Sequence, residues 1–367
     1  IETVASGVSR LNYPLIDGKV VGCPSHILEP QRTNLVTYSE DFSQSYWTEE
    51  NTLITSNSVI SPDGTLSADK IIATATNSAH SVFVSLSSSI SAGTSYCYSF
   101  FAKAEEYTKT AIRIGGGGYS TQPMAVINLL NGSVVSQQGF INLSVKDFSN
   151  GWYKINAVFT ATSSVAPNIQ PIADGFTTIL DNYTYNGDGT SGIYIWGAMF
   201  EQGSFPTSYI PNYGTSAGIT RSAETANGAG DASTFNDSEG VLMLEISALA
   251  DSVERKAITI SDGISNSERV LLSYEGQYVR AFVYTNSLLQ CNFQVLISDV
   301  SLINKIALKY KTNDFSLFVN GFQIATDSIG VTANNLDRLS FSDGTGSNPF
   351  YGNTKQIQYF DSALNDS

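Results

Sequence analysis

Aromatic and amide side chains in irregular segments carry the most distinctive chemistry of this sequence. Tyr119 follows the run Gly115–Gly118, and residues 181–189 read DNYTYNGDG. A flat aromatic ring covers the apolar face of a sugar, while Asn, Asp and Gln bond its hydroxyl groups in pairs. Binding residues also concentrate on loops. The candidates for carbohydrate binding are therefore Tyr119, Asp181, Tyr183, Tyr185, Asn186, Trp47 and Trp152.

Each candidate also has a purely structural interpretation. Trp152 follows Asn150-Gly151, so it could pack a core or seal the edge of a strand, and the tyrosines could be ordinary surface residues. The glycine run is not a phosphate-binding loop, because no Lys-Ser or Lys-Thr pair follows it and no helix opens there.

Catalytic residues are not indicated by any pattern. Cys23, Cys97 and Cys291 lack CxxC spacing, and the two histidines, His26 and His80, have no metal-binding motif around them. A glycosidase needs two carboxylates held about 5–10 Å apart. With 33 acidic residues, many pairs satisfy that spacing by chance. No GxSxG motif occurs. We therefore expect a protein that is not an enzyme.

Composition and charge restrict the class of partner. The 367 residues carry a formal net charge of -14, with 19 basic residues against 33 acidic ones. Nucleic-acid binding requires clustered Lys and Arg to neutralise phosphates, so nucleic acid is not expected as a partner. No apolar run reaches 18 residues, so membrane insertion is not expected either. Hydrophobic residues make up 42% of the chain and aromatic residues 11%, which indicates folded cores rather than disorder.

Short alternating segments predict a protein built from β-strands. Runs rich in aromatic and β-branched residues lie between Gly, Asn, Asp, Ser and Pro. The clearest are His80–Ser87, Thr94–Ala104, Trp152–Ala161 and Gly192–Glu201. In the third run, alternation predicts one apolar face and one largely polar, solvent-facing side. Asn131-Gly132 and Asn320-Gly321 predict hairpin turns, since Asn-Gly tolerates positive φ. These signals favour antiparallel β-sandwiches or jelly rolls.

Changes in composition predict the domain organisation. Residues 211–239 are small and polar, as in a linker, and a second strand-rich region starts at Gly240. Residues 1–30 contain Pro14, Pro24 and Pro30 and are too interrupted for a core strand. We therefore expect an extended lead-in at 1–30, lying over a surface or a neighbouring chain, a first domain at 31–230 and a second at 238–367.

The first domain resembles a known family in several motifs that keep their order. They are HILEPQRTNLVTYSEDFSQSYWT (His26–Thr48), SPDGTLSADKI, SYCYSFFAKA, GWYKI, IYIWGAMFEQGSFPTSYIPN (Ile193–Asn212) and ITRSAE. This series is similar to the jelly-roll, carbohydrate-binding-module-like domain of bacteriophage tail fibres and tailspikes. The resemblance implies a structural calcium, with Glu40 or Asp41 and Glu201 as candidate ligands; no DxDxDG loop is present. The alternative is that Glu40 and Glu201 cap turns or pair with Arg32 or Arg221.

The second domain resembles laminin-G-like, concanavalin-A-type lectin sandwiches. The similarity rests on NKIALKYKTNDFSLFVNGFQIATD (Asn304–Asp327) and NPFYGNTKQIQYFDSALND (Asn348–Asp366). Such sandwiches bind glycans, proteins or nothing, so the resemblance implies the fold more strongly than a ligand.

Together the resemblances imply a receptor-binding component of a virion tail, acting outside the cell at the host surface. Its partners would be bacterial surface polysaccharide and other virion tail proteins, and its assembly a homotrimer. Two alternatives stay open. One is a structural or docking protein of the virion without glycan binding, and the other is the non-catalytic accessory half of a polysaccharide depolymerase.

Overall fold

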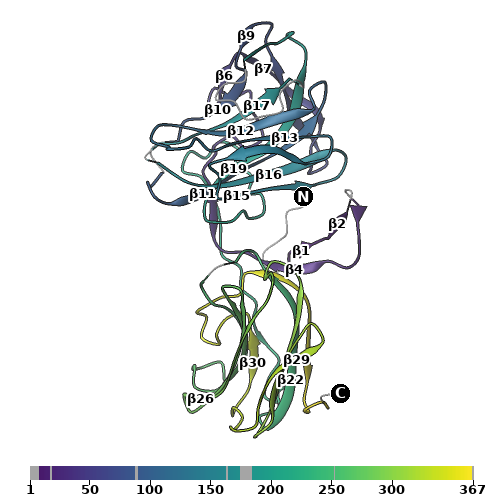
Figure 1. Cartoon of the computed structure of the whole chain (residues 1–367), viewed down its shortest axis with the longest axis vertical. Coiled ribbons are helices and arrows are strands. Elements are labelled where there is room, and N and C mark those ends of the chain that lie inside the picture. Colours follow the sequence, from purple (N-terminus) through teal and green to yellow (C-terminus); the bar gives the residue numbers. More distant parts are fainter. Residues whose placement is uncertain are drawn as a thin grey trace. The chain divides into compact units, whose positions relative to one another are not determined.

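The computed structural model describes residues 8–16, 19–86, 90–162, 164–173, 184–251 and 253–365. Within these ranges every regular element is a β-strand (Figure 1). The described residues contain no helix that is long and apolar enough to cross a membrane. The chain folds as two compact units. The first contains Leu15–Val21 and Gln31–Ser222, and the second contains Val4–Pro14, Gly22–Pro30 and Ala223–Ser367.

The first unit is a sandwich of two six-stranded antiparallel sheets. One sheet has the spatial order β14 (Val134–Gln138), β13 (Met124–Asn128), β12 (Lys109–Gly115), β17 (Ala166–Ile172), β10 (Ser81–Phe83) and β6 (Thr48–Glu50). The other has the order β15 (Asn142–Asp147), β16 (Trp152–Thr160), β11 (Ser95–Ala104), β19 (Gly192–Gln202), β8 (Leu66–Ala73) and β7 (Thr52–Ile60). Short pairs complete it: β2 (Leu15–Ile16) with β3 (Lys19–Val20), β5 (Arg32–Asn34) with β20 (Ile219–Arg221), and β9 (Asn77–Ser78) with β18 (Tyr185–Asn186).

The core of the first unit lies between these two sheets. Alternate residues of β12 and β13 meet a dense aromatic row from β11 and β19, which includes Tyr96, Tyr98, Phe100 and Phe200. The period-two alternation in the sequence therefore corresponds to real inward faces. The predicted strand at Trp152–Ala161 is confirmed, with Ile155, Ala157 and Phe159 in the core.

The prediction that one side of β16 faces solvent is wrong. Lys154 is 7% exposed and Asn156 is 2% exposed. The Lys154 ammonium group donates to the carbonyl of Thr207 at 2.9 Å. Lys154 is therefore buried where it holds the segment that follows β19, whereas the amide of Asn156 donates to the hydroxyl of Ser144 on β15 at 3.2 Å.

The second unit is also a sandwich of two antiparallel sheets. One has the order β1 (Leu11–Asn12), β4 (Ser25–Leu28), β31 (Gly352–Phe360), β22 (Glu239–Ala248), β27 (Asn304–Lys311), β28 (Phe315–Val319) and β29 (Phe322–Asp327). The other has the order β21 (Asn227–Ala229), β30 (Arg338–Ser340), β23 (Lys256–Ser261), β24 (Arg269–Glu275), β25 (Tyr278–Thr285) and β26 (Leu288–Leu296). The all-β architecture of two sandwiches, predicted from the sequence, is confirmed.

Part of the expected lead-in forms regular structure in the second unit. Strand β4 pairs with β31, and Leu28 belongs to the core of this sandwich. Arg10 forms ion pairs with Glu29 and Glu224, which fix the strand from both sides. The residues expected to form a linker are also divided, since β20 belongs to the first unit and β21 to the second. The chain therefore passes between the units near residue 222, earlier than the predicted start at 238.

The two predicted Asn-Gly turns have different outcomes. Asn320 and Gly321 both have positive φ and connect β28 directly to β29, as a type I′ hairpin requires. Between β13 and β14, Gly132 has positive φ but Asn131 does not. The connection there is longer than two residues, because the pairing is irregular at Ile127.

Candidate functional site

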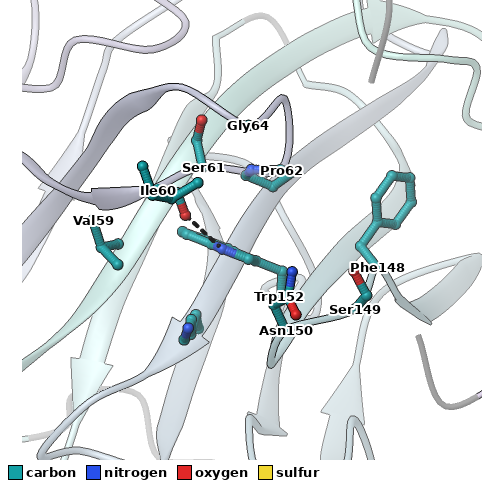
Figure 2. Close-up of a pocket in the computed structure, with 10 residues that line it drawn as sticks. Val59, Ile60, Ser61, Pro62, Gly64, Phe148, Ser149, Asn150 and Trp152 are labelled. Atoms are coloured by element: carbon teal, nitrogen blue, oxygen red, sulfur yellow. Dashed lines mark hydrogen bonds between the residues drawn. The ribbon is translucent and has the colours of Figure 1, made fainter. Parts of the chain in front are cut away.

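The first unit contains a pocket of about 280 Å³ on the outer side of its β15–β7 sheet (Figure 2). Three segments surround it: the end of β7, the turn that follows it, and the turn between β15 and β16. Its lining residues are Val59, Ile60, Ser61, Pro62, Gly64, Lys103, Phe148, Ser149, Asn150 and Trp152. We call this the Trp152 pocket.

Two tight turns shape the Trp152 pocket. Ser149 and Asn150 both have positive φ, at 73° and 52°, followed by Gly151. Asn tolerates this left-handed conformation because its short amide can bond locally. The N–H of Trp152 closes the turn on the carbonyl of Ser149 at 2.9 Å. In the opposite turn, Asp63 accepts hydrogen bonds from the backbone N–H and the hydroxyl of Thr65 at 2.9 and 2.7 Å.

The chemistry of the Trp152 pocket is polar and non-acidic. The Trp152 ring is only 2% exposed, and its indole N–H donates to the carbonyl of Ile60 at 3.1 Å, so it is the floor of the pocket. Phe148 is half-buried and stands edge-on against Phe101 at 5.0 Å. Lys103 and the exposed Asn150 supply ionic and amide groups. No lining residue is a carboxylate, so the pocket lacks the pair that glycoside hydrolysis requires.

The aromatic residues predicted to bind carbohydrate do not lie together in the structure. Trp47 is 4% exposed, contacts Phe42 at 4.7 Å and donates to the carbonyl of Tyr38, so it is a core residue that presents no free face. Tyr119 is half-buried against the sandwich core, with its hydroxyl at Thr162, and burial raises the pKa of that hydroxyl. Among the candidates that the structure describes, Trp152 lines the Trp152 pocket, and none of the others lines it.

Segment 181–189 is described only from residue 184 onward. Asp181 and Tyr183 lie outside the described residues. The Tyr185 hydroxyl donates to the carbonyl of Pro171 at 2.8 Å, and its ring contacts those of His80 and Tyr107. Desolvation raises the pKa of the Tyr185 hydroxyl. Asn186 is exposed beside this aromatic cluster, so the cluster anchors β18 rather than presenting a ring to a ligand.

The predicted calcium ligands are engaged by protein donors. Glu40 accepts from the hydroxyls of Tyr209 and Tyr213 at 2.9 and 3.1 Å. Asp41 accepts from the hydroxyl of Ser43 at 2.6 Å and the amide of Gln44 at 2.7 Å, and these bonds lower its pKa. The bonds to Glu40 both reach Oε1, and those to Asp41 use both of its oxygens.

Glu201 is the most deeply buried of the three candidate ligands. It is 0% exposed, accepts from the N–H and hydroxyl of Thr207, and pairs with Arg32 at 3.4 Å. Burial raises its pKa, whereas the bonds to Thr207 oppose that rise. Within the described ranges, no group of three or more His, Cys, Asp or Glu residues could hold a metal ion. Calcium binding therefore stays a prediction of the resemblance.

Asp69 is a buried carboxylate that the sequence did not single out. It is 1% exposed and accepts the backbone N–H groups of Phe42 and Asn57 at 2.8 and 2.9 Å. Desolvation raises its pKa from 3.8 to about 6. The folded state therefore holds the Asp69 proton more tightly than the unfolded state.

We expect Asp69 to make the first unit less stable as the pH rises from about 4 to about 6. Between these values the folded state binds more protons than the unfolded state, so the free energy of unfolding falls by at most about 1.4 kcal/mol per pH unit. The measurement is urea unfolding at several pH values, comparing the protein with Asp69→Asn. The difference between the two should change only in this window; a constant difference contradicts the prediction.

The sequence interpretation missed most of the Trp152 pocket. Lys103 ends a strand, and Phe148 stands just before the turn, so neither belongs to a recognisable motif. The available signal was Ser149-Asn150-Gly151, a turn between two strands, with Trp152 directly after it. That signal points to Ser149, Asn150 and Trp152 but not to residues 59–64 and Lys103, since these come from β7, its following turn and β11, which are distant in the sequence.

The second unit has a larger and more open pocket of about 390 Å³. It lies at β30 and the loops before β24 and β31. Its lining residues are Asn227, Gly228, Gly263, Ile264, Arg338, Ser340, Ser342, Gly344, Thr345 and Gly346. A Cβ on Gly263 would lie 2.0 Å from the Arg338 Nε, so only glycine lets Arg338 occupy this place. We call this the Arg338 pocket.

Comparisons with known proteins identify similar folds. No protein-family model matches the chain, and no curated protein matches it. The Ruminococcus gnavus IT-sialidase CBM40 is 18% identical with a TM-score of 0.32, covering 38% of this chain and 90% of that chain. Domains LG4-5 of the mouse laminin alpha1 chain are 10% identical with a TM-score of 0.29, covering 96% of both chains.

A further similar structure is sheep galectin-11 in complex with glycerol. It is 8% identical with a TM-score of 0.27, covering 37% of this chain and 95% of that chain. The solved structures thus include a carbohydrate-binding module, laminin G domains and a galectin. At these identities the similarity concerns the β-sandwich fold alone.

Proposed function

We propose that this protein is a receptor-binding component of a bacteriophage tail that adheres to bacterial surface glycans through the Trp152 pocket. The observation that carries the proposal is the combination of Phe148, Lys103 and Asn150 around one recess with no carboxylate. An apolar ring edge with amide and ammonium donors suits a hydroxylated ring. The order of motifs in the first domain, which resembles phage tail-fibre domains, supports the virion role.

Adhesion by such a pocket would depend on several copies acting together. A recess of about 280 Å³ covers little of a polysaccharide, so each site would bind weakly. Holding several sites together raises the effective concentration and gives secure attachment. Leu11, Tyr13 and Val20 are 49%, 48% and 58% exposed, and these apolar side chains support assembly with further copies, which we propose to be a homotrimer.

Asn150→Gly should weaken glycan binding at least about fivefold. Glycine keeps the positive φ of 52° and removes only the amide, so the turn is preserved. The measurement is calorimetric binding of purified host polysaccharide to the wild type and the variant. A lost bidentate hydrogen bond to a sugar costs about 1–3 kcal/mol, which gives this factor.

Asn57→Gly is the matched control for that experiment. Asn57 has φ of 53°, is exposed in the same unit, and does not line the pocket. Its substitution should leave binding unchanged. Equal binding by Asn150→Gly and the wild type would show that the Trp152 pocket is not the glycan-binding site. Absence of binding to any host glycan would favour a structural role in the virion. Release of oligosaccharides during incubation would indicate a depolymerase.

A further inference from the structure

Arginine side chains gather on one face of the second unit. In β24, Val270, Leu272 and Tyr274 point into the core, so Arg269 and Ser273 lie on the outer face of the β21–β26 sheet. In the same way, core residues Val279, Ala281 and Val283 place Arg280, Phe282 and Tyr284 of β25 on that outer face. In a chain with a net charge of -14, this concentration of arginine is unusual.

The register of the strands aligns these residues in rows. Arg338 of β30 is paired with Ser261 of β23, which is paired with Arg269 of β24, which is paired with Tyr284 of β25. The next pair on this face is Leu271 of β24 with Phe282 of β25. The pair after that is Ser273 of β24 with Arg280 of β25. We call the outer surface formed by Arg269, Ser273, Arg280, Phe282 and Tyr284 the arginine face. It continues through Ser261 to the Arg338 pocket.

Aromatic rings hold the guanidinium groups in place. Arg269 lies over the ring of Tyr284 at 4.5 Å. Arg280 and Arg255 lie over the ring of Phe282 at 5.0 and 4.9 Å. Cation–π contacts of this kind position a planar cation without using its N–H groups. The rings therefore fix the guanidinium groups at small cost in side-chain entropy when a ligand binds.

Positive charge on the arginine face exceeds its negative charge. Glu275 is shared by Arg255 and Arg280, at 3.1 and 3.8 Å. In the described part of the chain, Arg269 forms no ion pair. Its hydrogen bonds are to the side-chain oxygen of Asn266 at 2.6 Å and the backbone carbonyl of Asp343 at 3.2 Å. Both use Nη1, and Nε is buried, so Nη2 is the group of Arg269 that keeps its donors for a carboxylate.

The same face contains buried polar atoms without partners. Thr259 and Ser273 are 0% and 1% exposed, and their hydroxyl oxygens have no hydrogen-bond partner among the described residues. The Nε atoms of Arg269 and Arg280 are also buried and have no hydrogen-bond partner among the described residues. A buried polar group without a partner costs about 1–3 kcal/mol. Because these atoms are buried, a ligand on this face would meet the charged ends of the arginines and not these groups.

We propose that the arginine face binds a carboxylate-bearing oligosaccharide. The Nη2 group of Arg269 pairs with one carboxylate, and Arg280 attracts a second one about 13 Å away, four residues along the strand direction. The proposal extends the adhesion function proposed above to an acidic class of glycan, at a site in the other unit.

The experiment measures binding of the full chain to acidic oligosaccharides in 20 and 150 mM NaCl. The probes are oligogalacturonate, oligosialic acid and oligoglucuronate, each together with its carboxyl-reduced neutral form. We expect at least one acidic probe to bind at least tenfold more tightly than its reduced form, with weaker binding at the higher salt concentration. Arg269→Gln/Arg280→Gln should lose at least tenfold in affinity for that probe.

Lys305→Gln/Lys311→Gln is the charge-matched control. Both lysines lie on β27, in the other sheet of the same unit, and their removal changes the net charge equally. It should leave affinity within twofold. Equal binding of acidic and reduced probes, an unaffected arginine variant, or no binding of any acidic probe overturns the proposal. Binding of neutral host glycan that depends on Asn150 would then still support the adhesion function.

Discussion

Gly192→Ala should destabilise the first unit by more than about 3 kcal/mol. Gly192 begins β19 and pairs with Ile72 of β8. A Cβ at this position would lie 1.8 Å from the carbonyl oxygen of Ile71. That oxygen belongs to a backbone in the sheet, so no side chain can rotate away. The substitution must separate the two strands, which removes the hydrogen bonds that close this side of the sandwich.

Tryptophan fluorescence is the measurement for this prediction. All three tryptophans of the chain, Trp47, Trp152 and Trp196, lie buried in the first unit, so their emission follows its unfolding separately from the second unit. The control is Gly117→Ala, because a Cβ there meets no atom within 4 Å. Its urea midpoint should stay within the equivalent of about 0.5 kcal/mol or rise slightly. Equal midpoints for both variants would contradict the expected clash.

The strand architecture was predictable from the sequence because it depends on local alternation. The inward residues of β16 follow a strict period of two, and Asn320-Gly321 fixes its hairpin by local φ preference alone. The outward face of β16 was not predictable in this way. Lys154 and Asn156 look like solvent-facing residues, yet Lys154 holds a segment 53 residues away and Asn156 bonds to Ser144 of the neighbouring strand.

In the lead-in, residues 1–30, the sequence suggested too little regular structure. Prolines at positions 14, 24 and 30 suggested an irregular segment, yet Ser25–Leu28 lies between two of them and is long enough for a strand. Its partner, β31, is more than 300 residues away in the sequence. Prolines locate the ends of a strand but do not identify its partner.

A candidate site residue was predictable only where a turn motif directly precedes it in the sequence. Trp152 follows such a turn and does border a pocket, whereas Trp47 was chosen for its residue type and lies in the core. The arginines of the second unit had no motif at all. Arg269, Arg280 and Arg338 come from different strands, and only the register of four strands, from β30 through β23 and β24 to β25, places them on one face.

Glu201→Ala should destabilise the first unit by about 3–5 kcal/mol. Glu201 is fully buried and holds Thr207 through two hydrogen bonds, at 2.8 and 2.7 Å, while its charge faces Arg32 at 3.4 Å. Removing the carboxylate leaves the guanidinium of Arg32, with a side chain 16% exposed, next to a cavity. It also leaves the N–H of Thr207 without an acceptor. Both are penalties of burying polar groups without partners.

Two comparison variants identify the cause of that loss. Glu201→Gln keeps an acceptor for Thr207 and removes the charge, so it should lie between the wild type and Glu201→Ala in urea midpoint. Glu106→Ala removes a carboxylate that is 43% exposed and pairs with Lys70 in the same unit, and should cost less than about 1 kcal/mol. If Glu201→Ala costs no more than Glu106→Ala, then the segment after β19 is held by Lys154 and packing rather than by Glu201. In that case the buried charge would be a consequence of the fold and not one of the interactions that maintain it.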